Sequence, residues 1–167
     1  PLGESLNRAA ILSLTALSVA VAFQGGLFNI GVQGQFLMGA FVAAVTGTLA
    51  VPIPFFHLLL CLFAAATAGA FYALLVAVLK TRRGVHEVVS GIMLNWIALY
   101  FIEGWWVPGP FNATSTEGIS KAGTAEVFNS ALLPRLMGDA SRMHLGIALA
   151  FALAIGLAWL FRRSVFF

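Results

Sequence analysis

Residues 24–35 read QGGLFNIGVQGQ, a run of glycines, amides and apolar side chains that carries no formal charge. The run lies inside the longer stretch 9–79, which contains no Asp, Glu, Lys or Arg. Loops at a membrane surface usually carry charge, and glycine interrupts helices because its backbone is so permissive. The segment therefore predicts irregular backbone within a membrane protein.

The composition of the whole chain also indicates a membrane protein. Of the 167 residues, 60% are apolar and 9% are charged, against about 45–50% and about 25% in soluble globular proteins. Nine basic and six acidic residues cannot cover a soluble domain of this length. Basic residues cluster at 80–83 and 162–163, as is typical of cytoplasmic membrane loops. We therefore expect a lipid bilayer around the chain and no nucleic acid partner.

Five apolar stretches predict an all-α fold, a polytopic transmembrane helix bundle. They cover residues 9–23, 36–51, 53–79, 85–107 and 144–161. A helix needs about 20 residues to cross the bilayer, so the third stretch is long enough and the first two are short. Short, glycine-interrupted apolar segments indicate a substrate path, because unwound backbone at membrane depth requires protein or water around it. The alternative is that both helices extend through 24–35 and meet in an uncharged cytoplasmic turn.

Charged and aromatic residues predict the orientation of the bundle. The third stretch runs from outside to inside and is followed by a cytoplasmic loop at 80–84. The fourth stretch returns outward and ends near Trp105 and Trp106, which resemble an interfacial aromatic belt. The fifth stretch comes back to the basic pair at 162–163.

The polar segment 108–143 connects the fourth and fifth stretches and holds three charges of each sign. This mixture differs from the two basic inner clusters and predicts an external loop. The segment is longer than most connections, so we expect some local order within it. In particular, we expect a short amphipathic helix over 124–133 that ends before Pro134.

No residue pattern in the chain predicts enzymatic chemistry. The two lysines, Lys80 and Lys121, do not follow the glycine pattern of a G-x-x-x-x-G-K phosphate loop. His57, His86 and His144 lie far apart and near predicted membrane boundaries, where a hydrogen-bonded interfacial histidine is commoner than a metal ligand. We therefore expect no ATP hydrolysis, no metal site and no cofactor in this chain.

Two polar side chains on the fourth stretch are candidates for function. Glu87, Gly91 and Asn95 follow at four-residue spacing and lie on one helix face. Polar groups inside membrane helices usually face a partner or a cavity. For Glu87 the choice is between an inner-side gating contact and a structural cap or salt bridge at the surface. For Asn95, which is deeper, the choice is between the transport path and a hydrogen bond to another helix.

The break at 24–35 itself offers hydrogen-bonding groups without charge. Asn29, Gln33 and Gln35 can donate and accept hydrogen bonds, which suits a neutral, hydroxyl-rich or heterocyclic solute better than an ion. The second helix is predicted to begin near Gln35, so its free N–H groups would face the break. We predict that these three residues and Asn95 line a substrate path.

Two of these segments resemble the signatures of a known family. GLFNIGVQGQFLMGAFVAA at 26–44 and GVHEVVSGIMLNWIA at 84–98 look like the paired motifs of bacterial ABC-importer permeases for nucleosides and simple sugars, relatives of the ribose and branched-chain amino acid permeases. The resemblance implies a multi-pass inner-membrane permease that works by alternating access. It also implies a second permease subunit, cytoplasmic ATPase subunits and an external solute-binding protein as partners.

The chain departs from the family pattern at two positions. Gln33 stands where the first signature commonly has Glu, and His86 stands where Asn commonly precedes Glu in the second. A role that needs negative charge at Gln33 is therefore not expected. Family permeases have about twice as many residues, and residues 162–167 resemble the approach to their cytoplasmic coupling helix. We expect residues 1–167 to be a transmembrane permease fragment. The coupling helix, an earlier membrane helix and the second half of the permease would then lie outside it.

Two other classes of function stay open on the sequence. A secondary transporter or channel unit without an ATPase would need intramembrane acids or bases for ion coupling, and these are scarce. A structural membrane subunit would have no need of an uncharged, glycine-rich break. Copurification of an ATPase tests the first alternative, and water accessibility along 24–35 tests the second.

Overall fold

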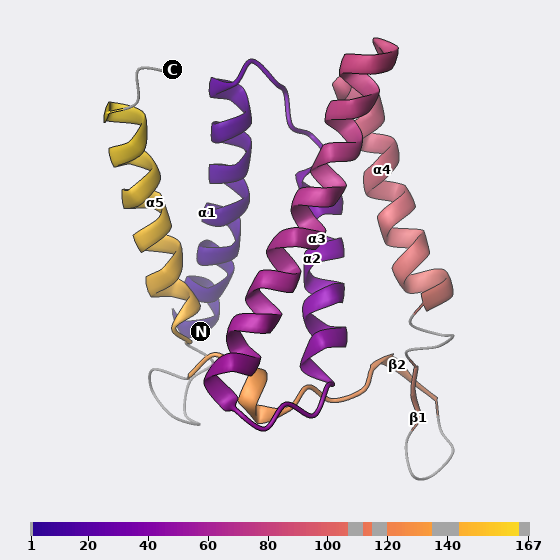
Figure 1. The fold of residues 1–167 in the computed structure, drawn as a ribbon, viewed down its shortest axis with the longest axis vertical. Helices are drawn as coiled ribbons and strands as arrows, with labels where there is room; N and C mark the ends of the chain where they lie inside the picture. The colour runs from indigo at the N-terminus through magenta and orange to yellow at the C-terminus, as the bar shows by residue number, and fades with distance from the viewer. Residues whose placement is uncertain (1, 107–111, 115–119, 135–143, 164–167) are drawn as a thin grey trace. The chain divides into compact units, whose positions relative to one another are not determined.

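The computed structural model describes residues 2–106, 112–114, 120–134 and 144–163. Five α-helices dominate this part of the chain, so the predicted all-α class is confirmed (Figure 1). They are α1 (Leu2–Gln24), α2 (Val32–Gly47), α3 (Pro54–Arg83), α4 (Glu87–Phe101) and α5 (Gly146–Arg163). Among the described residues, four helical segments are long and apolar enough to cross a membrane, namely Gly3–Gln24, Pro54–Arg83, Glu87–Gly104 and Gly146–Arg163.

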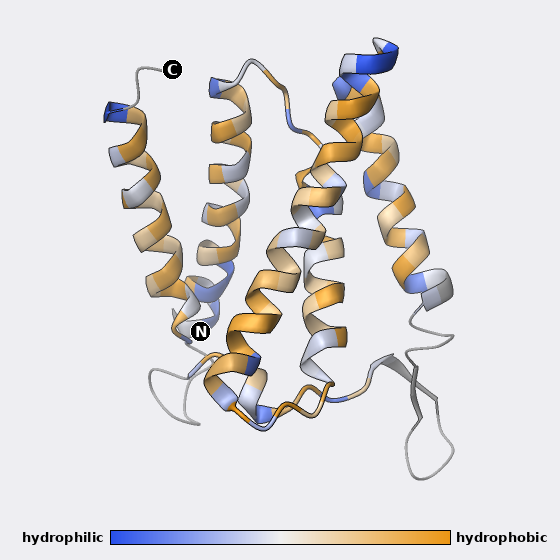
Figure 2. Ribbon diagram, in the orientation of Figure 1, coloured by the Kyte–Doolittle hydropathy of each residue, from blue (hydrophilic) through white to orange (hydrophobic). Residues whose placement is uncertain are grey.

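Apolar residues make up most of the helices (Figure 2), and many large apolar side chains are exposed. Phe55, Phe63 and Phe71 follow one another at eight-residue spacing along α3 and are 72%, 70% and 65% exposed. Eight residues rotate the helix by about 800°, so each ring is offset by about 80° from the one before it and the three rings spread around more than one face of α3. Apolar exposure on this scale is unfavourable in water and is the expected surface in lipid. The helices are those of a multi-pass membrane protein.

Helix α1 is longer than the apolar stretch that predicted it. It begins at Leu2 rather than Ala9, contains 23 residues and includes a candidate span. Its first turns hold the polar residues Glu4, Asn7 and Arg8, which lower the local hydropathy but are compatible with a helix. The carboxylate of Glu4 also lies in the first turn, where the helix dipole favours it. The expectation of two short initial helices is therefore wrong for α1.

Helix α2 is short, as predicted. Its 16 residues correspond to about 24 Å of helix, which is less than the hydrocarbon thickness of about 30 Å. The helix also starts at Val32 rather than near Gln35, because residues 32–35 continue the helical hydrogen bonding from the turn at Gly31. An element of this length reaches only part of the way across a bilayer.

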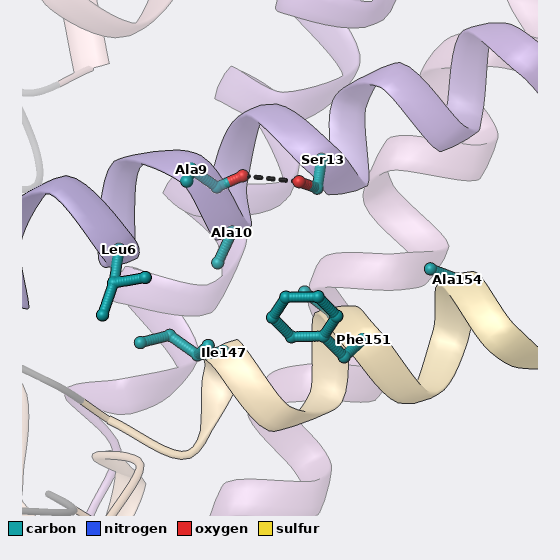
Figure 3. Close-up of a pocket in the computed structure, with 8 residues that line it drawn as sticks. Leu6, Ala9, Ala10, Ser13, Ile147, Phe151 and Ala154 are labelled. Atoms are coloured by element: carbon teal, nitrogen blue, oxygen red, sulfur yellow. Dashed lines mark hydrogen bonds between the residues drawn. The ribbon is translucent and has the colours of Figure 1, made fainter.

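The chain forms two compact units, of which the first comprises Pro1–Asn29 and Leu133–Phe167. In this unit α1 packs along α5, and a cavity of about 100 Å³ lies between the two helices (Figure 3). The cavity wall is apolar except for Ser13, whose hydroxyl donates a hydrogen bond to the Ala9 carbonyl at 2.7 Å. The cavity is therefore a gap in helix packing with little capacity to recognise a polar solute.

The second unit, Ile30–Leu132, contains α2, α3 and α4, and α2 packs against both other helices. A Cβ built on Gly39 would lie 3.0 Å from the carbonyl oxygen of Ala65, and one built on Gly69 would lie 3.3 Å from that of Gln35. Such close approach of two helix backbones requires small residues at the contact. Glycines in both helices therefore allow α2 to lie directly against α3.

Helix α3 continues through the basic cluster that was predicted to form a loop. It ends at Arg83, and Gly84 follows with a left-handed φ of 66° that a residue with a side chain rarely adopts. Lys80, Arg82 and Arg83 lie in the last turn, where cations interact favourably with the helix dipole. The connection to α4 is consequently short, and α3 and α4 pack together.

The connection after α4 contains elements that the sequence did not predict. The helix ends in a π-helical turn, Ile102–Trp106, and the strands β1 (Asn112–Thr114) and β2 (Ser120–Thr124) pair antiparallel. The expected helix over 124–133 is wrong: the described backbone there holds one 3₁₀ turn, η2 (Asn129–Ala131). The physical reason is tertiary, since extended backbone before η2 lets the Phe128 N–H donate to the Gly47 carbonyl at 3.0 Å.

Candidate functional site: the break before α2

The helical hydrogen bonding of α1 stops at two glycines. Gly26 has a left-handed φ of 72°, and the Leu27 N–H donates back to the Ala22 carbonyl at 2.9 Å. Because a residue with a Cβ is strained at this φ, the sequence GG at 25–26 is the local cause of the helix end. The chain then leaves the helix axis and reaches α2 at Val32.

The side chain of Asn95 holds the start of α2. Its Oδ1 accepts the Gly34 N–H at 2.8 Å, and its Nδ2 donates to the Ile30 carbonyl at 3.0 Å. The first N–H groups of a helix have no partner within the helix, and the N-cap residue Gly31 has no side chain to supply one. Asn95 therefore caps α2 from another helix.

Asn95 also shows where along α4 the start of α2 lies. It lies in the middle of the candidate span Glu87–Gly104, and not at the end that adjoins the basic residues of α3. The turn at 30–34 is in contact with it and so lies beside the middle of α4.

Close packing around Gly34 leaves no room for a side chain. A Cβ at this position would lie 2.8 Å from Cε1 of Tyr72 and 3.0 Å from Oδ1 of Asn95. A Cβ on Gly91 would lie 2.9 Å from the backbone nitrogen of Gly31. The glycines on α2 and α4 thus let the first turn of α2 approach the backbone of α4.

Tyr72 completes this arrangement from α3, and it was not among the residues predicted from the sequence. The side chain is buried, and its hydroxyl donates to the Leu94 carbonyl of α4 at 2.6 Å. The available signal was chemical, because a tyrosine among the small and apolar residues of a membrane helix needs a hydrogen-bond partner for its hydroxyl. Tyr72 and Asn95 together connect all three helices of the second unit.

The predicted path residues lie in different elements of the chain. Asn29 belongs to the first unit, where its Nδ2 donates to the Ser18 hydroxyl at 3.4 Å. Gln33 is exposed and Gln35 is half-buried, both in the first turns of α2. Two positions along a helix correspond to a rotation of about 200°, so these two side chains leave α2 on nearly opposite faces.

Glu87 lies at the charged end of α4, away from Asn95. Its Oε1 forms an ion pair with Nζ of Lys80 at 2.9 Å, and the two side chains are 16% and 33% exposed. The pair joins the last turn of α3 to the first turn of α4. His86 is the N-cap of α4 and makes no capping hydrogen bond with its side chain, although Asn at this position would be a preferred cap.

The comparison with known proteins covers nearly the whole chain. The family described as the permease component of the branched-chain amino acid transport system matches residues 2–166. The guanosine ABC transporter permease protein of Bacillus subtilis is 35% identical over 162 residues, which cover 97% of this chain and 46% of that protein. No solved structure matches the chain.

Two further relatives carry different names. The nucleoside ABC transporter permease protein of Lactococcus lactis is 40% identical over 102 residues, which are 60% of this chain and 28% of that protein. The glucose ABC transporter permease protein of Haloferax volcanii is 36% identical over 128 residues, 74% of this chain and 33% of that protein. The chain therefore spans less than half the length of each of these relatives.

Proposed function

Because the chain belongs to the family of branched-chain amino acid transport permease components, we propose that it forms part of the membrane permease of an ATP-driven importer. The proposed solute is a nucleoside or a simple sugar, which is supported by relatives named for guanosine, nucleosides and glucose. The permease would move this solute across the bacterial inner membrane by alternating access.

The proposed partners follow from this assignment. ATP binding and hydrolysis would take place in cytoplasmic ATPase subunits, since the sequence contains no phosphate-binding loop. A second permease subunit and an external solute-binding protein would complete the transporter. Copurification of the full-length protein with an ATPase tests this set, and ion-coupled uptake without any ATPase would contradict it.

One observation carries the proposal of a transport path: the turn at 30–34 lies beside the middle of a membrane-spanning helix. Irregular backbone at that depth is stable only where protein or a water-filled cavity satisfies its polar groups. Asn95 satisfies two of those backbone groups. A purely structural subunit would gain nothing from starting the short helix α2 there.

The path residues proposed from the sequence take different roles in this geometry. Gln33 is exposed in the first turn of α2, and we assign it to direct contact with the solute. Gln35 and Asn29 remain proposed path residues on the grounds given by the sequence. The amide of Asn95 is engaged with the backbone, so its contribution is to shape the wall. Neutral amides suit hydroxyl groups or ring nitrogens of a nucleoside or sugar.

Uptake measurements on the full-length transporter test these assignments. Gln33→Ala should raise the KM for the solute while membrane insertion and partner assembly persist, because the lost contact is a binding contact. Thr67→Ala is a matched control, since Thr67 is exposed on α3 and its hydroxyl bonds only to the Ala64 carbonyl of its own helix among the described contacts. Unchanged uptake kinetics in Gln33→Ala would remove this residue from the path.

A further inference from the structure

Helix α2 is held at its outer end by a histidine that the proposed path does not use. His57, in the first turns of α3, is 0% exposed. Its Nε2 lies 3.0 Å from the Thr46 carbonyl, and because a carbonyl can only accept, Nε2 carries the proton. Its Nδ1 is then free to accept the Ser130 hydroxyl proton at 2.7 Å. One imidazole therefore joins α2, α3 and η2.

Two more contacts bring the chain before η2 onto the same end of α2. The Phe128 N–H donates to the Gly47 carbonyl at 3.0 Å, which is one of the last carbonyls of α2 and has no partner within the helix. A Cβ built on Gly47 would lie 2.6 Å from Cγ1 of Val127, so this glycine is needed for the contact. In Figure 1 the orange chain passes beneath the lower ends of α2 and α3. We call residues 127–130 with His57 the outer clasp.

The other end of α2 is held by Asn95, as described above. A helix of 16 residues is stiff along its axis because each turn is hydrogen-bonded to the next. A short helix fixed at both ends moves as one body when either end is displaced. The outer clasp and the break are the two ends of the same rigid element.

We propose that His57 is a positioning residue that couples the external connection to the break through α2. A displacement of residues 127–130, such as a protein docking on the outer face would cause, is passed by His57 and Gly47 to α2 and arrives at Gln33. The proposal rests on the proposed function, since it treats the break as part of the transport path. It adds a route by which the outer surface controls that path.

Water accessibility at Gln33 measures this coupling without requiring transport. The test uses the full-length transporter in membranes, with Cys61→Ala and every other native cysteine of the transporter replaced, and with Gln33→Cys as the reporter. Labelling by a membrane-impermeant maleimide is timed in this background and with His57→Leu or Ser130→Ala added. Both additions should change the labelling rate of the reporter severalfold. A second reporter, Thr81→Cys, lies exposed at the charged end of α3 and should keep its labelling rate.

Conservative variants separate a positioning role from general damage. His57→Gln retains a donor for the Thr46 carbonyl and an acceptor for Ser130, and Ser130→Thr retains the hydroxyl, so both should restore the original rate at Gln33→Cys. The proposal is overturned if the clasp variants alter labelling only at a reporter next to the clasp, such as Thr48→Cys, and leave Gln33→Cys unchanged. Normal uptake in Gln33→Ala would instead contradict the proposed path while leaving the measured coupling intact.

Discussion

The side-chain oxygen of Asn95 accepts the backbone N–H of Gly34 at 2.8 Å, across a sequence separation of 61 residues. The same amide donates to the Ile30 carbonyl at 3.0 Å. A single side chain on α4 thus supplies the capping hydrogen bond that the N-cap residue Gly31 cannot make, and it also holds the turn before α2 in place. The start of α2 is therefore placed by a tertiary contact and not by its own residues.

Replacing Asn95 by Leu should destabilise the protein. The substitution keeps a similar volume but leaves the Gly34 N–H and the Ile30 carbonyl without this partner, and an unsatisfied buried group costs about 1–3 kcal/mol. We expect a lower midpoint of thermal unfolding in detergent and a lower maximal uptake rate. Asn95→Asp keeps the acceptor and loses the donor, so its unfolding midpoint should lie between those of Asn95→Leu and the native protein. Equal stability of Asn95→Leu and the native protein would contradict the capping role.

Gly34→Ala tests the close packing at the start of α2. The new methyl group would meet the Tyr72 ring and the Asn95 oxygen within 3.0 Å, and overpacking of this kind costs about 1–3 kcal/mol. Gly156→Ala is the matched control, because the structure leaves open space at Gly156 in α5. The control should be neutral or slightly stabilising, since alanine favours a helix interior by about 1 kcal/mol over glycine. Thermal unfolding of the two variants distinguishes them.

Tyr72→Phe should weaken the contact between α3 and α4 without leaving a cavity. The ring remains, and only the hydrogen bond from the hydroxyl to the Leu94 carbonyl is lost, at a cost of about 0.5–1.5 kcal/mol. Tyr100→Phe serves as the control, because Tyr100 is 68% exposed. Denaturant or thermal unfolding should rank Tyr72→Phe below Tyr100→Phe. The reverse order would exclude the Tyr72 hydroxyl as a stabilising contact.

The ion pair of Lys80 with Glu87 should contribute little to stability. Both side chains are partly exposed, and solvent screens the attraction between charges in such pairs. Glu87→Gln should therefore change the unfolding midpoint only slightly, and the change should shrink at high salt. A large loss of uptake at normal stability would instead assign Glu87 to gating. The exchanged pair Lys80→Glu with Glu87→Lys would then show whether the attraction itself is required.

Much of the fold follows from local signals in the sequence. The uncharged length of residues 53–79 and the basic cluster after it predict α3, and the aromatic residues near Trp105 predict the end of the fourth stretch. The errors lie where hydropathy carries little information. The polar first turns of α1 are helical although they are not apolar. The chain before η2 is extended where the Phe128 N–H donates to the Gly47 carbonyl.

The candidate site could be predicted only in part. Its residues were found from the contrast between uncharged amides and an apolar surrounding, which is a property of composition. Composition did not predict which contacts these residues make. Asn29 lies in the first unit, and Asn95 bonds to backbone groups rather than to the other predicted path side chains. Tyr72 and His57 drew no attention as path residues because each is a single polar side chain whose partners are distant in sequence.

The sequence by itself determined that the chain is a set of apolar helices with an uncharged break, because hydropathy, charge and glycine content act on neighbouring residues. Only the tertiary structure decided where that break lies and what holds it. The positions of both ends of α2 depend on hydrogen bonds from Asn95 and His57, which are formed across helices. Such bonds form where helix packing leaves a backbone N–H or carbonyl without a partner. The local sequence does not predict which backbone groups these are.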